Sequence, residues 1–309
     1  MKKTTRNLAI GLVVLVILVF FPYISPPFQL RMLTEIIIFT LFTLTWKMML
    51  NEGGMFSFGH AAYFGLGAYA SVLGWLHIKG LSFLSGVFLG GLAAALVAFL
   101  LSAFLVRLSG TYFALLTFAF NQLIWGLIWK WRAVTGGDDG LGSFPKPDLL
   151  GVAMKSPENF YYATLVIIGL CLFLCWYLIK TPFGNTVMSI KANEERAKFI
   201  GIHVNTTKII FLTQLGFFAG VSGALFAQFH EFICPTVIDM GRSTNVLFMA
   251  YIGGVGHFWG PLVGSGIFVY LSEYLSSLTD RWEFFLGLVF VIIAVFAPQG
   301  IAGIIKRKR

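Results

Sequence analysis

The chain has 309 residues, of which 58% are hydrophobic and only 11% are charged. A soluble domain carries about 25% charged residues, so this composition excludes an ordinary soluble protein and indicates an integral membrane protein. The net charge of +9 does not indicate nucleic-acid binding. The basic residues gather at both ends and in one central polar segment, as the positive-inside bias of membrane proteins predicts.

Ten apolar runs predict membrane-spanning segments, because a helix needs about 20 apolar residues to cross a bilayer. In chain order they are Leu8–Ile24, Leu30–Leu50, Phe56–Leu76, Leu81–Leu105, Thr111–Trp131, Phe160–Ile179, Ile209–Phe229, Ser243–Val255, Phe258–Leu278 and Trp282–Ile305. The first run follows a basic start without a clear small-residue cleavage site, which favours a retained span over a signal peptide. The pattern predicts an all-α polytopic bundle, with residues 1–309 forming a single transmembrane domain.

Basic clusters predict the orientation of these spans. Residues 2–6, 180–208 and 306–309 each carry several lysines or arginines, and ten spans place all three clusters on the cytoplasmic side. Lys130 and Arg132 are exceptions, because the same count places them outside. We therefore expect both termini and the segment 180–208 in the cytoplasm.

The segment 180–208 is the one long polar insert, and it predicts two short helices. Thr181 and Pro182 suit a helix N-cap followed by a first-turn proline, and Asn193 could cap the second helix. Phe183, Val187 and Ile190 share one apolar face of the first helix. The segment fits either an amphipathic helix on lipid headgroups or a docking helix for a soluble partner.

The second predicted helix carries acidic residues at its start. Glu194 and Glu195 fall in its first turn, where the helix dipole favours negative charge, and Gly201 is a natural stop.

Two glycine-rich stretches, Gly53–Tyr69 and Gly253–Tyr270, interrupt the predicted spans. Glycine allows close helix packing and allows a helix to break inside a protein, and such breaks in corresponding halves are typical of transport pathways. The alternative is tight packing alone. The candidate pathway residues are Gly53, Gly54, Gly59, His60, Gly65, Tyr69, Gly253, Gly254 and Gly260.

Two predicted outer loops, 132–159 and 231–242, are polar enough to face a soluble partner or simply to be solvated turns. Asp138 and Asp139 lie in the first, within the sequence TGGDDG. Intramembrane acids often mark ion pathways, and Glu35 and Glu273 are the fair candidates here. His60 and His257 fit either hydrogen-bonded side chains or a proton relay.

Motifs for catalysis and metal binding are missing from the sequence. It contains no GxxxxGK[ST], HExxH or GxSxG, and its three cysteines do not form a disulfide or zinc pattern. We therefore expect no enzyme activity, no cofactor and no bound metal.

Several motifs together resemble the permeases of the branched-chain amino acid family of ABC transporters. They are GGMFSFGHAAYFGLGAYA (53–70), TYFALLTFAF (111–120), TGGDDGL (135–141), TPFGNTVMSIKANEERAKFIGI (181–202), FFAGVSGALFAQ (217–228), YIGGVGHFWGPLVGS (251–265) and FAPQGIAGI (296–304). They run in the family's order over nearly the whole chain. The TGGDDGL loop and the FAPQG end resemble the second, longer permease of the pair.

The resemblance implies an importer in the inner cell membrane, in which this permease and a homologous partner form the channel. Two separate ATPase subunits would dock on the segment 180–208, and a soluble binding protein would deliver the substrate. The candidate residues for contact with the ATPases are Phe183, Val187, Ile190, Glu194, Glu195 and Gly201, and those for docking of the binding protein are Asp138 and Asp139. Leucine, isoleucine and valine are the implied substrates, and related permeases carry other amino acids, urea or amides. An ion-coupled carrier that needs no ATPase, and a membrane scaffold or enzyme, are the competing classes.

Overall fold

The computed structural model describes residues 18–296 apart from residues 20, 24 and 150, together with residues 300, 301 and 303. The predicted span Leu8–Ile24 lies mostly outside the described residues. The long helices are α2 (Pro27–Asn51), α3 (Ala61–His77), α4 (Phe83–Leu105), α5 (Gly110–Lys130), α7 (Pro157–Lys180), α10 (Val204–His230), α11 (Met240–Gly253), α12 (Gly260–Leu278) and α13 (Trp282–Phe296). The short elements are α6 (Arg132–Thr135), η1 (Gly137–Asp139), β1 (Leu141–Gly142), α8 (Pro182–Ala192), α9 (Glu194–Phe199), β2 (Phe232–Ile233) and η2 (Pro235–Val237). The predicted helical bundle is confirmed.

Five of the described helices, α2, α4, α5, α7 and α10, are long and apolar enough to cross a membrane. The helices α3 and α11, in the glycine-rich and the short predicted spans, have only 17 and 14 residues. The chain is thus a multi-pass helical protein, and the count of ten spans stays a prediction.

The centre of the bundle is α10, which packs against α2, α3 and α4 through small residues. A Cβ added to Gly67 of α3 would lie 2.3 Å from the Cα of Gly220 in α10. A Cβ on Gly220 would in turn lie 2.8 Å from the carbonyl oxygen of Gly90 in α4. Lipid provides no hydrophobic driving force for association between helices. Their association depends instead on dispersion and polar contacts, which this close approach allows. One of these polar contacts is the 2.7 Å hydrogen bond that the Ser222 hydroxyl donates to the carbonyl of Ile38.

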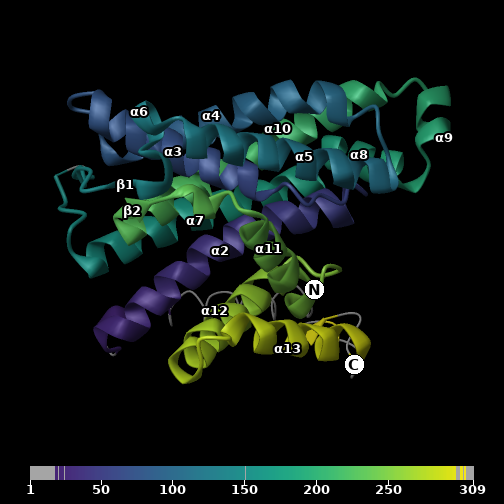
Figure 1. Cartoon of the computed structure of the whole chain (residues 1–309). Helices are drawn as coiled ribbons and strands as arrows, with labels where there is room; N and C mark the ends of the chain where they lie inside the picture. The colour runs from purple at the N-terminus through teal and green to yellow at the C-terminus, as the bar shows by residue number, and fades with distance from the viewer. Residues whose placement is uncertain are drawn as a thin grey trace.

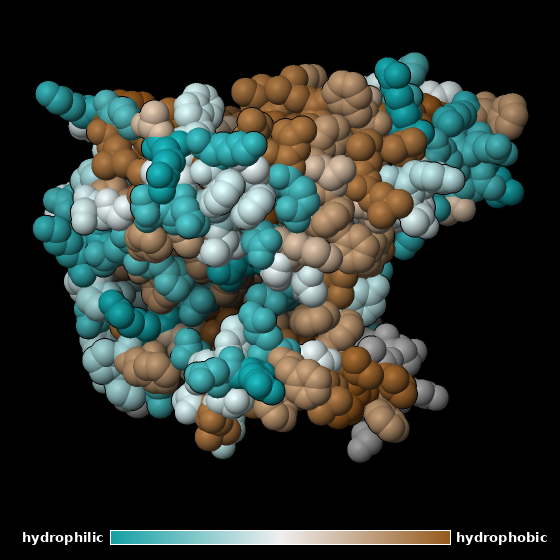
Figure 2. Space-filling model, viewed as in Figure 1, coloured by the Kyte–Doolittle hydropathy of each residue, from teal (hydrophilic) through white to brown (hydrophobic). Residues whose placement is uncertain are grey.

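Large apolar side chains remain exposed along α4, α5 and α7, as expected for helices that face lipid; Leu96, Leu115 and Val166 are examples. Figure 2 shows hydrophobic side chains covering the middle of one face, with hydrophilic ones at the left-hand end and on the tip formed by α8 and α9. The surface therefore has the banded polarity of a membrane protein.

The bundle has two distinct ends (Figure 1). At one, which we call the projecting end, α8 and α9 extend beyond the other helices. At the other, which we call the strand end, β1 pairs with β2 through Leu141↔Ile233 and Gly142↔Phe232. The helix α10 joins the two ends, because it begins just after α9 and finishes just before β2.

Two segments fold back into the bundle from opposite ends. Residues 52–60 return from the projecting end along α2, so that His60 lies beside Thr45 and α3 begins inside the protein. From the strand end, the chain enters the bundle as far as Ile238, whose carbonyl accepts a 2.8 Å hydrogen bond from the side-chain amide of Asn121 in α5. The two helices that follow start side by side, because the Ala61 amide of α3 donates to the Ser243 hydroxyl of α11 at 3.1 Å.

Candidate functional site

The segment between α7 and α10 forms the two helices that its residues predict. The Thr181 hydroxyl accepts from the amide of Gly184, and Pro182 occupies the first turn of α8. The Asn193 side chain accepts a 2.8 Å hydrogen bond from the amide of Arg196 and so caps α9. Gly201 follows with φ +85°, a conformation that glycine adopts without strain. These local predictions are confirmed.

Glu194 fixes α9 to the start of α10. Its carboxylate lies 2.7 Å from the Lys208 ammonium of α10 and 3.0 Å from that of Lys198 one turn away. The hydrogen bond from Lys208, with the nearby charge of both lysines, holds the pKa of Glu194 below its ordinary value. The short helix is therefore held against its neighbour at neutral pH.

The apolar face of α8 points into this chain. Val187 and Ile190 are each only 4% exposed, and Ile190 packs with Ala197 and Val204 from the neighbouring helices. Phe183 is partly buried against the main core. The structure thus differs from the expectation that these three side chains face a partner: helical spacing shows that they share a face but cannot show what covers it.

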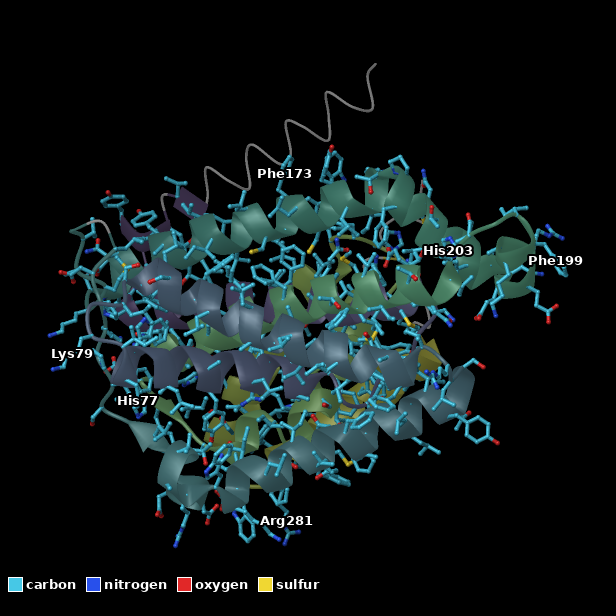
Figure 3. All side chains as sticks on the ribbon, turned by 90° about the horizontal axis from the view of Figure 1, so that it is seen from above. His77, Lys79, Phe173, Phe199, His203 and Arg281 are labelled. Atoms are coloured by element: carbon cyan, nitrogen blue, oxygen red, sulfur yellow. The ribbon has the colours of Figure 1, made fainter. Side chains whose placement is uncertain are left out.

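The exposed apolar residues of the segment are instead at its tip. Phe199 is 90% exposed and Ile200 is 71% exposed, and Glu195 is exposed beside them. Figure 3 shows Phe199 at the far end of the projecting segment, with His77 and Lys79 at the opposite end of the molecule. We call Phe199 and Ile200 the apolar tip.

A chain of polar contacts joins α8 to the end of α2. The Lys191 ammonium donates to the carbonyl of Asn51 at 2.6 Å, and the Asn51 amide donates to the Glu52 carboxylate at 3.1 Å. The same Glu52 oxygen lies 2.6 Å from the Lys47 ammonium, and both charged side chains are buried. This pair was not predicted from the sequence. The sequence feature that could have indicated it is a lysine and a glutamate five positions apart at the end of an apolar run.

A cavity of about 610 Å³ lies beside these contacts, between the start of α5 and the α8–α9 segment. Gly54, Ser109 and Glu195 are among the residues that line it. Gly54 has φ +69°, and an added Cβ would lie 2.8 Å from the Lys191 side chain. The glycine therefore allows α8 to approach the returning segment closely.

The other candidate pathway glycines of the first stretch are packed against neighbouring helices. A Cβ at Gly59 would lie 2.0 Å from the carbonyl oxygen of Thr117, and one at Gly65 would lie 2.0 Å from the Ile238 side chain. Gly53 is similarly enclosed, with Met49 and Phe211 within 2.9 Å of an added Cβ. In this conformation these glycines bring α3 and the returning segment against α5, η2 and α10.

His60 and Tyr69 lie in the protein interior. The His60 ring accepts or donates a 2.8 Å hydrogen bond with Thr45 and stacks on Phe42 with ring centroids 5.5 Å apart. The Tyr69 hydroxyl is buried without a hydrogen-bond partner among the described residues. His60 lies just before the start of α3, whereas Tyr69 lies in the middle of that helix.

In the second glycine-rich stretch, the chain reverses from α11 into α12. A Cβ at Gly253 would lie 2.0 Å from the carbonyl oxygen of Gly260, and one at Gly260 would lie 2.3 Å from that of Gly254. Gly254 has φ +102°, which strongly favours glycine. Residues 254–259 therefore form a tight turn between α11 and α12.

Asp138 and Asp139 are exposed at the strand end, in η1. Asp139 forms a loose 3.5 Å ion pair with Arg132, which leaves the carboxylate of Asp138 in solvent. The two acids are far from the apolar tip, at the other end of α10.

Comparison with known proteins identifies the chain's relatives. Residues 28–294 match the family described as branched-chain amino acid transport system / permease component. The chain is 25% identical to the high-affinity branched-chain amino acid transport system permease protein LivM of Salmonella typhimurium, over 97% of this chain and 76% of that protein. LivM of Escherichia coli K12 matches with the same identity and coverage. No solved structure matches.

A more distant relative covers less of the chain. The autoinducer 2 import system permease protein LsrC of Klebsiella pneumoniae is 26% identical over 55% of this chain and 49% of its own length. The family match, in contrast, includes every long helix described above except the first residue of α2 and the last two residues of α13. The chain therefore belongs to the family of permease components of branched-chain amino acid transport systems.

Proposed function

We propose that this chain is one of two permeases in an ATP-driven importer of leucine, isoleucine and valine, located in the inner membrane. The observation that carries the proposal is the projecting α8–α9 segment, which is rigidly attached to the bundle and ends in the apolar tip. The sequence contains no P-loop, so ATP hydrolysis must come from other subunits. A rigid exposed segment is suited to transmit their movement.

The apolar tip and its surrounding charges favour a groove on a soluble subunit as the partner. Phe199 and Ile200 supply apolar anchors, and Glu195 and Arg196 flank them with exposed charges of both signs. Two ATPase subunits, one for each permease, are the partners that the family implies. In this arrangement the projecting end and both termini face the cytoplasm.

Attachment of α8 on two sides supports the role of a lever. Glu194 connects α9 to α10, and Lys191 connects α8 to the end of α2. A displacement of the tip would therefore move the base of α10 and the returning segment 52–60 together. That returning segment leads directly to α3, whose start touches the start of α11.

The share of this chain that each relative matches favours an amino acid as the substrate. The LivM proteins match over nearly the whole chain, whereas LsrC matches about half of it. A substrate delivered by a soluble binding protein would arrive at the strand end, where Asp138 and Asp139 are exposed and where we place the docking surface for that protein.

Copurification with a matched pair of variants tests the docking role. The complex is expressed with its neighbouring genes, and P-loop subunits bound to the tagged permease are identified by mass spectrometry. We expect Ile200→Asp to remove the ATPases and Ile78→Asp to retain them, because Ile78 is an exposed isoleucine next to His77 and Lys79 at the strand end. Absence of any P-loop subunit in the wild-type complex would contradict the proposed function. Retention of the ATPases by Ile200→Asp would contradict the docking site.

A further inference from the structure

A cavity of about 440 Å³ lies between α2, α11, α12 and α13, which lie together in the lower half of Figure 1. It belongs to the strand-end half, because Glu35 in its wall is 3.7 Å from His230, the last residue of α10. The volume falls in the range of about 300–1,000 Å³ that is typical of small-molecule sites. None of the candidate pathway residues from the two glycine-rich stretches lines it, but Glu35 and Glu273, the candidate acids for an ion pathway, both do.

Arg242, in the first turn of α11, supplies the only basic side chain among the described residues that line this cavity. Its guanidinium carbon lies 5.4 Å from the Phe39 ring centroid and 5.0 Å from that of Phe226. Cation–π contacts with two rings hold the group in place without using its hydrogen-bond donors. Among the described residues, no carboxylate or carbonyl accepts a hydrogen bond from these donors, so they are available to an anionic ligand.

The remaining walls carry acids and apolar surface. Glu35 is partly buried inside the cavity, whereas Asp239, Glu273 and Glu283 are exposed around its rim. Asp239 also caps α11 through a 2.7 Å hydrogen bond from the Met240 amide. Phe268 and Val269 of α12 are buried and give the cavity an apolar wall.

We propose that this cavity binds a zwitterionic amino acid with an apolar side chain. Arg242 binds the α-carboxylate, Glu35 with the rim acids binds the α-ammonium, and Phe268 and Val269 contact the side chain. A guanidinium matches a carboxylate with two parallel hydrogen bonds, and a nearby carboxylate matches an ammonium. The inference rests on the proposed function, because it assigns a site to the substrate class proposed above.

The position of the cavity also connects it to the projecting segment. Ser243, next to Arg242, accepts the hydrogen bond from Ala61 at the start of α3. Residues 52–60 then lead back from α3 to Asn51, which binds Lys191 of α8. Movement of α8 would therefore reach the wall that carries Arg242 through covalently connected and hydrogen-bonded elements.

Three ligands of similar shape test the chemistry on the wild-type complex. Binding to the complex in nanodiscs is measured by isothermal titration with leucine, with leucinol, which lacks the carboxylate, and with 4-methylpentanoate, which lacks the ammonium. We expect leucine to bind and each analogue to bind at least about 10-fold more weakly, because one charged hydrogen-bonding partner is lost. Leucinol binding as tightly as leucine would overturn the proposal and indicate a site for cations, which the excess of acids over Arg242 could also attract.

Variants locate the site. Arg242→Gln is expected to weaken leucine binding about 10- to 100-fold. Arg242→Lys is expected to bind leucine with an affinity between those of Arg242→Gln and the wild type, because lysine keeps the charge without the forked donors. Arg281→Gln is the matched control, since Arg281 is an exposed arginine at the edge of the molecule in Figure 3 and does not line the cavity. ATPase association, measured as above, reports whether each variant folds.

The outcomes separate the two claims. If the wild type shows ATP-dependent leucine uptake and a folded Arg242→Gln complex shows the same uptake, the proposed binding site is wrong and the proposed function stands. A wild-type complex that takes up no branched-chain amino acid would overturn the proposed function, and this inference with it.

Discussion

The buried pair of Lys47 and Glu52 gives the sharpest prediction about stability. Their charged atoms are 2.6 Å apart, and their side chains are only 2% and 8% exposed. Lys47→Met would leave the Glu52 carboxylate buried with only the Asn51 amide as a donor. Removing one partner of a buried pair costs roughly 3–5 kcal/mol, because the other charge stays desolvated and uncompensated. Replacing both, in Lys47→Met/Glu52→Leu, removes both charges and should recover most of the loss.

The matched control is Lys146→Met, because Lys146 and Glu231 are also 2.6 Å apart but Glu231 is 60% exposed. Lys146 itself is 14% exposed, but the Glu231 carboxylate that would be left behind is hydrated, so the pair contributes only about 0–1 kcal/mol. Thermal unfolding of the purified chain in detergent, followed by loss of monodisperse protein, measures all four proteins. We expect Lys47→Met to lower the apparent Tm by on the order of 10 °C and Lys146→Met by about 2 °C. Equal shifts for the two single variants, or a double variant no more stable than Lys47→Met, would refute the reasoning.

Three further predictions follow from the packing and the projecting segment. Gly223→Ala places a Cβ 1.8 Å from a carbonyl oxygen of α3 and should destabilise the bundle by about 3 kcal/mol or more in the same thermal assay, whereas Gly169→Ala, with nothing within 4 Å, should be neutral or slightly stabilising. Because the folded-state pKa of Glu194 is lowered, its ion pairs stabilise α9 above the unfolded-state pKa of about 4.3 and are lost as pH falls through the folded value. A nitroxide label at Phe199→Cys should therefore stay immobile from pH 8 to 6 and become mobile at lower pH, and Glu194→Gln should make it mobile already at pH 7; a label indifferent to both changes would contradict this. Lys191→Met should keep the ATPases bound but reduce the uptake per ATP hydrolysed, and an unchanged ratio would contradict the role of its contact with α2.

Features fixed by neighbouring residues could be predicted from the sequence. The caps at Thr181 and Asn193, the proline start of α8 and the stop at Gly201 each depend on a few consecutive residues, and each is confirmed. The helical bundle itself follows from runs of apolar residues, because lipid leaves the backbone no other partner than its own helix. The family resemblance rests on motifs spread over the whole chain, and the family match confirms it.

Features that depend on distant parts of the chain could not be predicted. Val187 and Ile190 share a face by spacing, yet only the fold shows that this face is covered by the chain itself. Glu35 and Arg242 are about two hundred positions apart in the sequence, and the residues next to each give no indication of the cavity that both line. Likewise, the meeting of Ala61 with Ser243 follows from two segments that fold back from opposite ends.

Uptake by the reconstituted complex tests the central claim most directly. The permease, its homologous partner and the copurifying ATPases are placed in liposomes with the soluble binding protein, and radiolabelled leucine uptake is followed with and without ATP on the ATPase side. We predict uptake that requires ATP, is insensitive to proton and sodium ionophores, and is lost in Ile200→Asp but kept in Ile78→Asp. Uptake that continues without ATP and collapses when the ion gradient is dissipated would contradict the account and identify an ion-coupled carrier.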